Sequence, residues 1–377
     1  MNLISSENAE QNNFKCHFCT KCDGNACIGE MPGMGGPKES INFLHNCSDW
    51  EKIPFGPIKF DDFDDEIDAD VLASNGDFAK SDACAKKTAA SLQEVPVLCA
   101  KRQSAGKTDD FLQEVRVSNK TASFITKTAN PNKKIQALTK KIALAPITGA
   151  QENIGWANEK EYYFKMTQAC ENAGIEISLG DGTPDEKLLW GIEAIKSLQK
   201  SDPQKKVSVF IKPYPQEKFF ERTEWALPVA KIIGVDIDSY NIVTMRNLVH
   251  LEKKTATQLL EIKNHLANKK IPFAIKGVFT DDDLELVKKV QPDIIYISNH
   301  GGRVETLQGS TARFLEKNAS ELKNYCKELW IDGGIRKIQD VKKALSYGTD
   351  KILLGRPFIT ALCLKKDFKT LLLEFFE

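Results

Sequence analysis

Eight short apolar segments, each followed by a stretch with helical spacing, dominate the sequence after about residue 140. Continuous apolar runs are typical of parallel strands covered on both faces, and parallel neighbours need a crossover, usually a helix. The runs are IALAPIT (142–148), GIEISLG (174–180), VSVFIKP (207–213), AKIIGVDID (230–238), IPFAIKG (271–277), DIIYISN (293–299), ELWIDGG (328–334) and KILLGRP (351–357). They predict an α/β fold, a closed (β/α)8 TIM barrel over residues 135–377, with an open doubly wound sheet as the alternative.

The chain before the barrel differs in composition. Residues 1–50 hold five of the ten cysteines and predict an irregular cysteine-rich extension. Residues 51–134 begin with an acidic run and show little periodicity, which indicates an irregular, partly helical connecting region.

Charge and hydropathy exclude several partners. Fifty-two basic residues balance fifty-two acidic ones, so the net charge indicates neither nucleic acid nor an anionic membrane surface. The N-terminus lacks a basic stretch followed by an apolar one, and no apolar run approaches the roughly 18 residues of a membrane span. We therefore expect a cytoplasmic protein without a membrane span.

Polar residues gather where the predicted strands end, which is where barrels place their chemistry. Lys276 and His300 end adjacent strands, and a lysine in that position needs an anion beside it. His300 is suited to proton transfer near neutral pH, and Arg303 offers a planar fork suited to a carboxylate. A structural histidine that caps a loop is the alternative.

Two glycine turns followed by arginines come after the last two strands, in DGGIR and LGRP. Backbone N–H groups of such turns converge on anions, and barrels commonly bind phosphate at this place. The turns therefore predict a phosphate site at Gly333, Gly334 and Gly355, although glycine could serve tight turns alone.

Three segments resemble a known family in order and spacing: IPFAIKGVFTDDDLELV, IIYISNHGGR and LWIDGGIRKIQDVKKALSYGTDKILLGRPF. The sequence is similar to the FMN-dependent 2-hydroxy acid oxidases and dehydrogenases, which include glycolate oxidase, lactate oxidase and flavocytochrome b2. The resemblance is specific over residues 271–361 and weaker over residues 135–238, where LAPITGA resembles the first barrel strand.

The resemblance implies a role for each matching residue. Lys276 would neutralise the N1/O2 edge of the flavin, His300 would take a proton from the substrate, and Arg303 would hold the substrate carboxylate. Asp236 best matches the aspartate that pairs with the histidine, with Asp238 as a close competitor. The residues implied to bind FMN are Pro146, Thr148, Lys276, Asp332, Gly333, Gly334, Arg336, Gly355 and Arg356.

The chain also departs from the family pattern. A substrate tyrosine is expected before the barrel, yet the first tyrosine is Tyr162. The third strand reads FIKPYP, so Lys212 takes the place of a second tyrosine as a substrate-binding residue and Tyr214 is displaced. A second substrate arginine is missing, and Arg246 is its candidate substitute.

The implied activity is oxidation of a small (S)-2-hydroxy acid, such as lactate or glycolate, to the 2-oxo acid. Oxygen or a redox partner would accept the electrons, and the resemblance is compatible with a homo-oligomer. One alternative is a flavin barrel with different chemistry, like type 2 isopentenyl diphosphate isomerase. Another is a flavin- or metal-binding sensor without turnover.

The segment CHFCTKCDGNAC places four cysteines close together, at Cys16, Cys19, Cys22 and Cys27. Closely spaced thiolates favour zinc or an iron–sulfur cluster, and His17 or Cys47 could add a ligand. Reduced thiols packed in a tight loop are the alternative.

Overall fold

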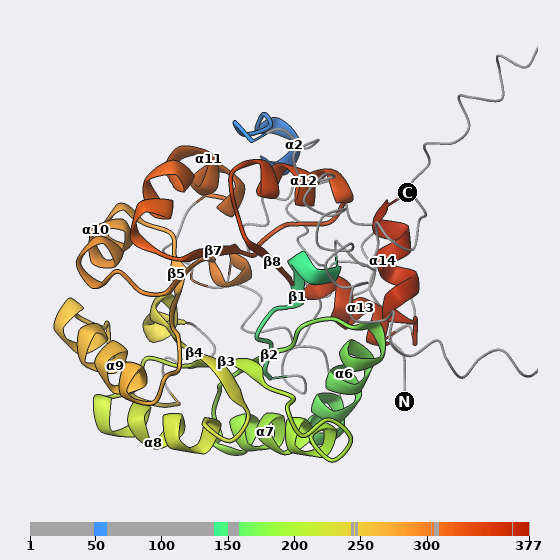
Figure 1. Cartoon of the computed structure of the whole chain (residues 1–377), viewed down its shortest axis with the longest axis vertical. Coiled ribbons are helices and arrows are strands. Elements are labelled where there is room, and N and C mark those ends of the chain that lie inside the picture. Colours follow the sequence, from blue (N-terminus) through green and yellow to red (C-terminus); the bar gives the residue numbers. More distant parts are fainter. Residues whose placement is uncertain are drawn as a thin grey trace, which may run out of the picture. The chain divides into compact units, whose positions relative to one another are not determined.

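The structure, a computed structural model, describes residues 49–58, 139–149, 158–242, 245, 248–302, 304, 309–363 and 365–376. Each predicted apolar run forms a strand in this part of the chain (Figure 1). The strands are β1 (Ile142–Leu144), β2 (Ser178–Gly180), β3 (Val207–Ile211), β4 (Ala230–Asp236), β5 (Phe273–Val278), β6 (Ile294–Ile297), β7 (Glu328–Ile331) and β8 (Lys351–Leu354).

The strands form one parallel sheet in the order β1-β8-β7-β6-β5-β4-β3-β2. Parallel bridges from Ala143 to Glu176 and from Ile147 to Leu179 join its two ends. The N–H of Leu144 also donates to the carbonyl of Glu176 at 2.8 Å. The predicted barrel is therefore confirmed over the open sheet.

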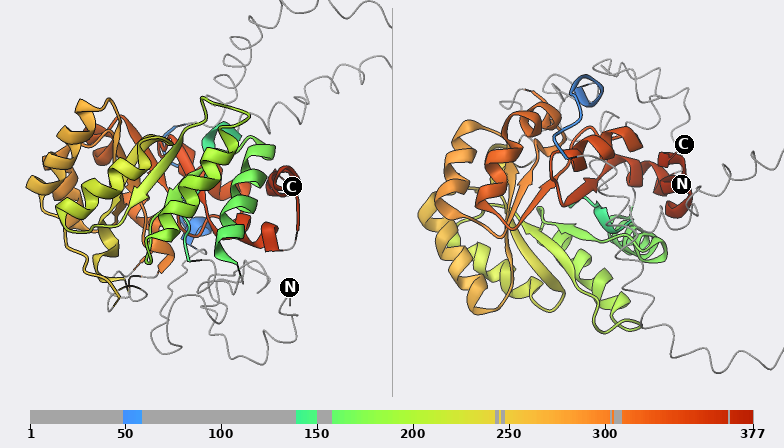
Figure 2. Two further views of the ribbon diagram at one scale, coloured as in Figure 1. Left: turned by 90° about the horizontal axis from the view of Figure 1, so that it is seen from below. Right: turned by 45° about the horizontal axis from the view of Figure 1, so that its top comes forward.

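Helices surround the strands in all views (Figures 1 and 2). They are α6 (Glu159–Ala173), α7 (Glu186–Leu198), α8 (Gln216–Ala226), α9 (Ala256–Asn268), α10 (Asp281–Val290), α11 (Thr311–Leu322), α12 (Ile338–Ser346), α13 (Arg356–Cys363) and α14 (Phe368–Phe376). Within the described residues, no helix is both long and apolar enough to span a bilayer.

Local sequence signals explain where these helices begin and end. Thr280 accepts the N–H of Asp283 at 3.1 Å, and Asp283 accepts the N–H of Thr280 at 2.9 Å, which forms a capping box before α10. Asn158 caps the start of α6, and Gly174 ends it in the left-handed conformation that glycine adopts without strain.

Aromatic side chains fill the interior of the barrel. Phe210 lies edge-to-face on Tyr296, with ring centroids 5.4 Å apart, and Trp330 completes the cluster. Gly234 makes room for it, because a Cβ there would lie 2.6 Å from the Phe210 ring. The interior is therefore a packed core, and any site must lie above it, at the carboxyl ends of the strands.

Residues 49–58, which include helix α2 (Asp49–Lys52), pack outside the barrel against α11 and α12 (Figures 1 and 2). We call them the strap. The ammonium of Lys343 donates to the carbonyls of Trp50, Glu51 and Ile53 at 2.7, 2.9 and 2.7 Å. The described start of the predicted connecting region thus contacts the barrel, while the boundaries 1–50 and 51–134 stay predictions.

Candidate active site

His300 begins a tight turn, η5 (His300–Gly302), which is separated from the end of β6 by two residues. His300, Gly301 and Gly302 have φ values of 57°, 65° and 78°, so three successive residues adopt the left-handed region. Two of them are glycines, which reach this region without strain, but the histidine is strained there. Arg356 holds the turn by donating to the carbonyl of Gly301 at 2.9 Å. Such strain at a strand end supports a functional role for His300.

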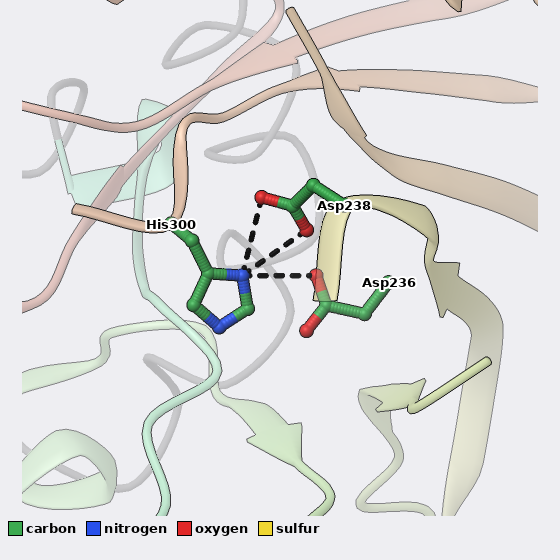
Figure 3. Close-up of side chains that lie close together, drawn as sticks. All are labelled: Asp236, Asp238 and His300. Atoms are coloured by element: carbon green, nitrogen blue, oxygen red, sulfur yellow. Dashed lines mark hydrogen bonds and ion pairs between the residues drawn. The ribbon is translucent and has the colours of Figure 1, made fainter. Parts of the chain in front are cut away.

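Two aspartates face the Nδ1 atom of His300 (Figure 3). The oxygens of Asp238 lie 3.1 and 3.3 Å from Nδ1, whereas the nearest oxygen of Asp236 lies 3.6 Å away. Asp238 is therefore the hydrogen-bond partner of the histidine and Asp236 lies within ion-pair distance of it, so the expectation that Asp236 is the catalytic partner stays a prediction. Asp238 reaches the ring because it packs over Gly277, where a Cβ would lie 2.5 Å from its Oδ1.

Asp236 instead binds two lysines. Its Oδ2 lies 2.6 Å from Lys212 Nζ and its Oδ1 lies 2.7 Å from Lys276 Nζ, and all three side chains are buried. Burial alone would raise the pKa of Asp236, but His300 and the two ammoniums hold it well below its ordinary value. Asp236 is therefore an anion that keeps two cations in the site.

The other carboxyl of the pair behaves differently. Burial, followed by the charge of Asp236, raises the pKa of Asp238 to about 8. Burial opposes the charged form of Lys276, yet Asp236 and Asp238 raise its pKa above the ordinary value. The site therefore holds fixed charges on Lys276 and Asp236 and a carboxyl on Asp238 that titrates near physiological pH.

The second lysine fixes the tautomer of the histidine. Lys212 Nζ lies 3.2 Å from His300 Nε2, and an ammonium can only donate hydrogen bonds. Nε2 is thus the unprotonated nitrogen, and Nδ1 carries the proton that faces Asp238. This is the state that a general base requires.

A cavity that opens to solvent lies at this end of the barrel. Lys212, Lys276 and His300 line one part of it. Most of the remaining wall comes from the loops after β1, β7 and β8, and includes Pro146, Thr148, Asp332, Gly333, Gly334, Arg336, Gly355 and Arg356. The cavity therefore brings together every residue implied to bind FMN.

Residues 197–367 match the family model of FMN-dependent dehydrogenases. The matched range includes β3 to β8, with both lysines, His300 and both glycine turns. This stretch, somewhat less than half of the chain, is similar to the FMN-dependent dehydrogenases. The match agrees with the predicted resemblance, and the matched motifs lie around one cavity.

Individual members of the family match shorter stretches. The chain is 36% identical to rat 2-hydroxyacid oxidase 2 over 98 residues, which cover 26% of this chain and 28% of the relative. It is 43% identical to L-lactate dehydrogenase of Stenotrophomonas maltophilia over 91 residues, which cover 24% of each. The chain thus spans about a quarter of the length of the curated relatives it matches. A mandelate oxidase structure is 20% identical, with a TM-score of 0.45, over 62% of this chain and 70% of the other.

Some predicted site residues lie outside the described residues. They are Arg303, the candidate carboxylate clamp, its substitute Arg246, and Cys16, Cys19, Cys22 and Cys27 of the predicted metal site. Among described residues, Asp236, Asp238 and His300 offer ligand atoms within 4.8 Å of one another. Lys212 and Lys276 already bind the carboxylate of Asp236, so a metal ion at this cluster would have to displace two ammonium groups.

The sequence did not reveal a buried ion pair between Asp181 and Arg222 that holds the backbone of Lys212. Asp181 accepts the backbone N–H of Lys212 at 3.2 Å and binds Arg222, whose side chain is fully buried, at 2.5 Å. The signal was present in α8: Phe219, Arg222 and Ala226 share its buried face. An arginine on the core face of a helix indicates a buried carboxylate partner.

The raised pKa of Asp238 predicts how stability depends on pH. The folded pKa of about 8 exceeds the ordinary 3.8, so the folded state binds more protons between these values. The stability that this proton contributes is fully present below pH 3.8 and is lost as the pH rises through about 8. In Asp238→Asn, the free energy of unfolding should fall less than in the wild type from about pH 5 to about pH 9.

Urea unfolding at several pH values measures this difference. Asp282→Asn is the matched control, because that side chain is exposed in the first turn of α10. It should follow the wild-type profile. If the profile of Asp238→Asn also runs parallel to the wild type, Asp238 does not hold a proton in the folded state.

Proposed function

We propose that the chain is an FMN-dependent oxidoreductase that oxidises a small (S)-2-hydroxy acid, such as lactate or glycolate, to the 2-oxo acid. The observation that carries the proposal is the arrangement of His300, with Nε2 unprotonated and Nδ1 directed at Asp238, beside a cavity lined by Lys276 and two glycine turns. The match to the family model supports the flavin, and the names of the matched relatives support the substrate class.

The residues around the cavity fit FMN. Gly333, Gly334 and Gly355 leave their backbone accessible to a phosphate, and Arg356 adds positive charge. The Oδ1 atom of Asp332 is buried and accepts no hydrogen bond from the described residues, so a ribityl hydroxyl could satisfy it. Asp332 would therefore hold the ribityl chain, and Arg336 and the glycine turns would hold the phosphate.

Lys276, whose ammonium is buried, would neutralise the N1/O2 edge of a bound flavin. Bound FMN would supply an acceptor for the two electrons that are released when the C2–H bond of the substrate breaks. Lys276 would favour negative charge on the ring because it stays protonated between Asp236 and Asp238.

His300 would take the hydroxyl proton of the substrate at Nε2. Asp238 accepts a hydrogen bond from Nδ1 and Asp236 lies 3.6 Å from the same nitrogen, so both stabilise the imidazolium that forms. Lys212 lies beside Nε2 and would donate to the substrate oxygen as its proton leaves. Arg303 would hold the carboxylate.

Anaerobic titration of the FMN-loaded chain tests this proposal. We expect the flavin absorption to bleach with at least one acid of a panel containing (S)-lactate, glycolate and (S)-mandelate, and not with the matching acids that lack the 2-hydroxyl. A chain that binds FMN but is reduced by none of them would contradict the proposed oxidation and favour a sensor or a flavin barrel with different chemistry. A chain that takes up no FMN would overturn the site assignment.

A further inference from the structure

A buried tryptophan outside the barrel contacts the predicted phosphate turn. Trp50 in the strap is 1% exposed, and its indole Nε1 donates to the carbonyl oxygen of Gly333 at 2.8 Å. Thr311 Oγ1, at the start of α11, donates to the same oxygen at 3.1 Å. Two donors outside the cavity therefore hold one carbonyl of the turn.

That carbonyl controls where a neighbouring N–H points. The C=O of Gly333 and the N–H of Gly334 belong to one planar trans peptide, so the two groups point in opposite directions. Gly333 and Gly334 both line the cavity, whereas Trp50 and Thr311 do not. When the carbonyl is held toward Trp50, the N–H of Gly334 is directed away from the strap.

The turn needs such a restraint because it is made of glycines. Gly333 and Gly334 have φ values of 97° and 73°, and glycine adopts many other conformations at little energetic expense. A larger residue cannot stiffen the turn, because a Cβ at Gly333 would lie 2.6 Å from Thr311 Oγ1. Hydrogen bonds to the carbonyl can fix the peptide while leaving the cavity side open.

The strap itself is firmly docked. Asp49 accepts a hydrogen bond from Ser310 Oγ at 2.8 Å, and Gly56 donates its N–H to Ser346 Oγ at 2.7 Å. Together with the three carbonyls bound by Lys343, these contacts hold the strap at both ends of Trp50. The indole is therefore a rigid donor.

We propose that Trp50 is a positioning residue for the flavin phosphate: it fixes the Gly333–Gly334 peptide so that the N–H of Gly334 faces the anion. The inference rests on the proposed function, because it takes the anion to be the phosphate of FMN. It predicts a role in phosphate recognition that leaves the isoalloxazine ring unaffected.

Riboflavin, which lacks the phosphate, separates this role from a general structural one. The test is equilibrium titration of the full chain with FMN and with riboflavin, followed by flavin fluorescence, for Trp50→Phe and the wild type. Phe keeps most of the packing but removes the N–H. We expect FMN affinity to fall about tenfold, the size of one lost hydrogen bond, with riboflavin affinity unchanged.

Thr311→Val provides a second, nearly isosteric variant in case Trp50→Phe does not fold, and it should also reduce the preference for FMN. Trp190→Phe in α7 is the matched control and should leave both affinities unchanged. Equal losses for FMN and riboflavin, or a wild-type preference for FMN in both variants, would overturn the inference. A wild type without preference for FMN would instead count against the proposed function.

Discussion

Replacement of His300 by Asn should slow flavin reduction by a 2-hydroxy acid about 10²- to 10⁴-fold, the range that general base catalysis contributes. Asn suits this position because it tolerates the left-handed backbone, with φ of 57°, better than most residues. It keeps a polar side chain near Asp238 and Lys212 but cannot take a proton. The rate of anaerobic flavin bleaching measures the effect.

FMN binding should survive the change, since the predicted phosphate and ribityl contacts come from the loops after β7 and β8. His250→Asn, at a side chain that is 77% exposed, is the matched control and should reduce flavin at the wild-type rate. An unchanged rate in His300→Asn would show that another group takes the proton.

Replacement of Lys276 by Met should have the second large effect. It removes the cation that would face the flavin and leaves Asp236 with Lys212 as its lysine partner. Flavin becomes negatively charged when it is reduced. We therefore expect the affinity for reduced flavin, relative to that for oxidised flavin, to fall at least tenfold. The reduction potential should drop by about 30 mV for each tenfold change, and flavin reduction should slow at least about 100-fold.

Lys276→Arg keeps the positive charge, so the flavin reduction potential should stay close to the wild-type value, although the planar guanidinium does not match the geometry of an ammonium. Lys289→Met, at an exposed position on α10, is the control for loss of one positive charge. A potential in Lys276→Met equal to that of the wild type would place the flavin ring away from Lys276.

The barrel and the strand-end residues were predictable because they depend on local pattern. An apolar run followed by polar residues fixes where a strand ends, and barrel geometry brings those ends to one mouth. Lys276 and His300 could therefore be assigned to one cavity from the sequence, and the structure places both there.

The partner of His300 could not be predicted in the same way. Asp236 and Asp238 are two residues apart at one strand end, and the sequence favoured the first. The choice depends on the bend of η4 (Ile237–Asn241) and on the bare Cα of Gly277 in the next strand. It also depends on Lys212 and Lys276, which form ion pairs with Asp236 from the end of β3 and from β5. These are contacts between distant segments.

The role of Trp50 shows the same limit more strongly. Its hydrogen bond to Gly333 joins residues 283 positions apart, and the sequence predicted only an irregular cysteine-rich segment around it. A tryptophan in a polar segment does indicate burial, since such a large apolar side chain rarely stays exposed. The surface that buries it could not be read from the sequence.

We propose that His300 takes the hydroxyl proton of a 2-hydroxy acid, while FMN held beside Lys276 would accept the two electrons of the C2–H bond. The most direct measurement mixes the FMN-loaded chain, without air, with (S)-lactate carrying hydrogen or deuterium at C2, and follows the flavin absorption. We expect bleaching that is slower with the deuterated acid, because the C2–H bond breaks as the flavin is reduced. If lactate fails, the acid that bleaches the flavin in the panel replaces it. A flavin that stays oxidised with every acid would overturn the proposed oxidation of a 2-hydroxy acid.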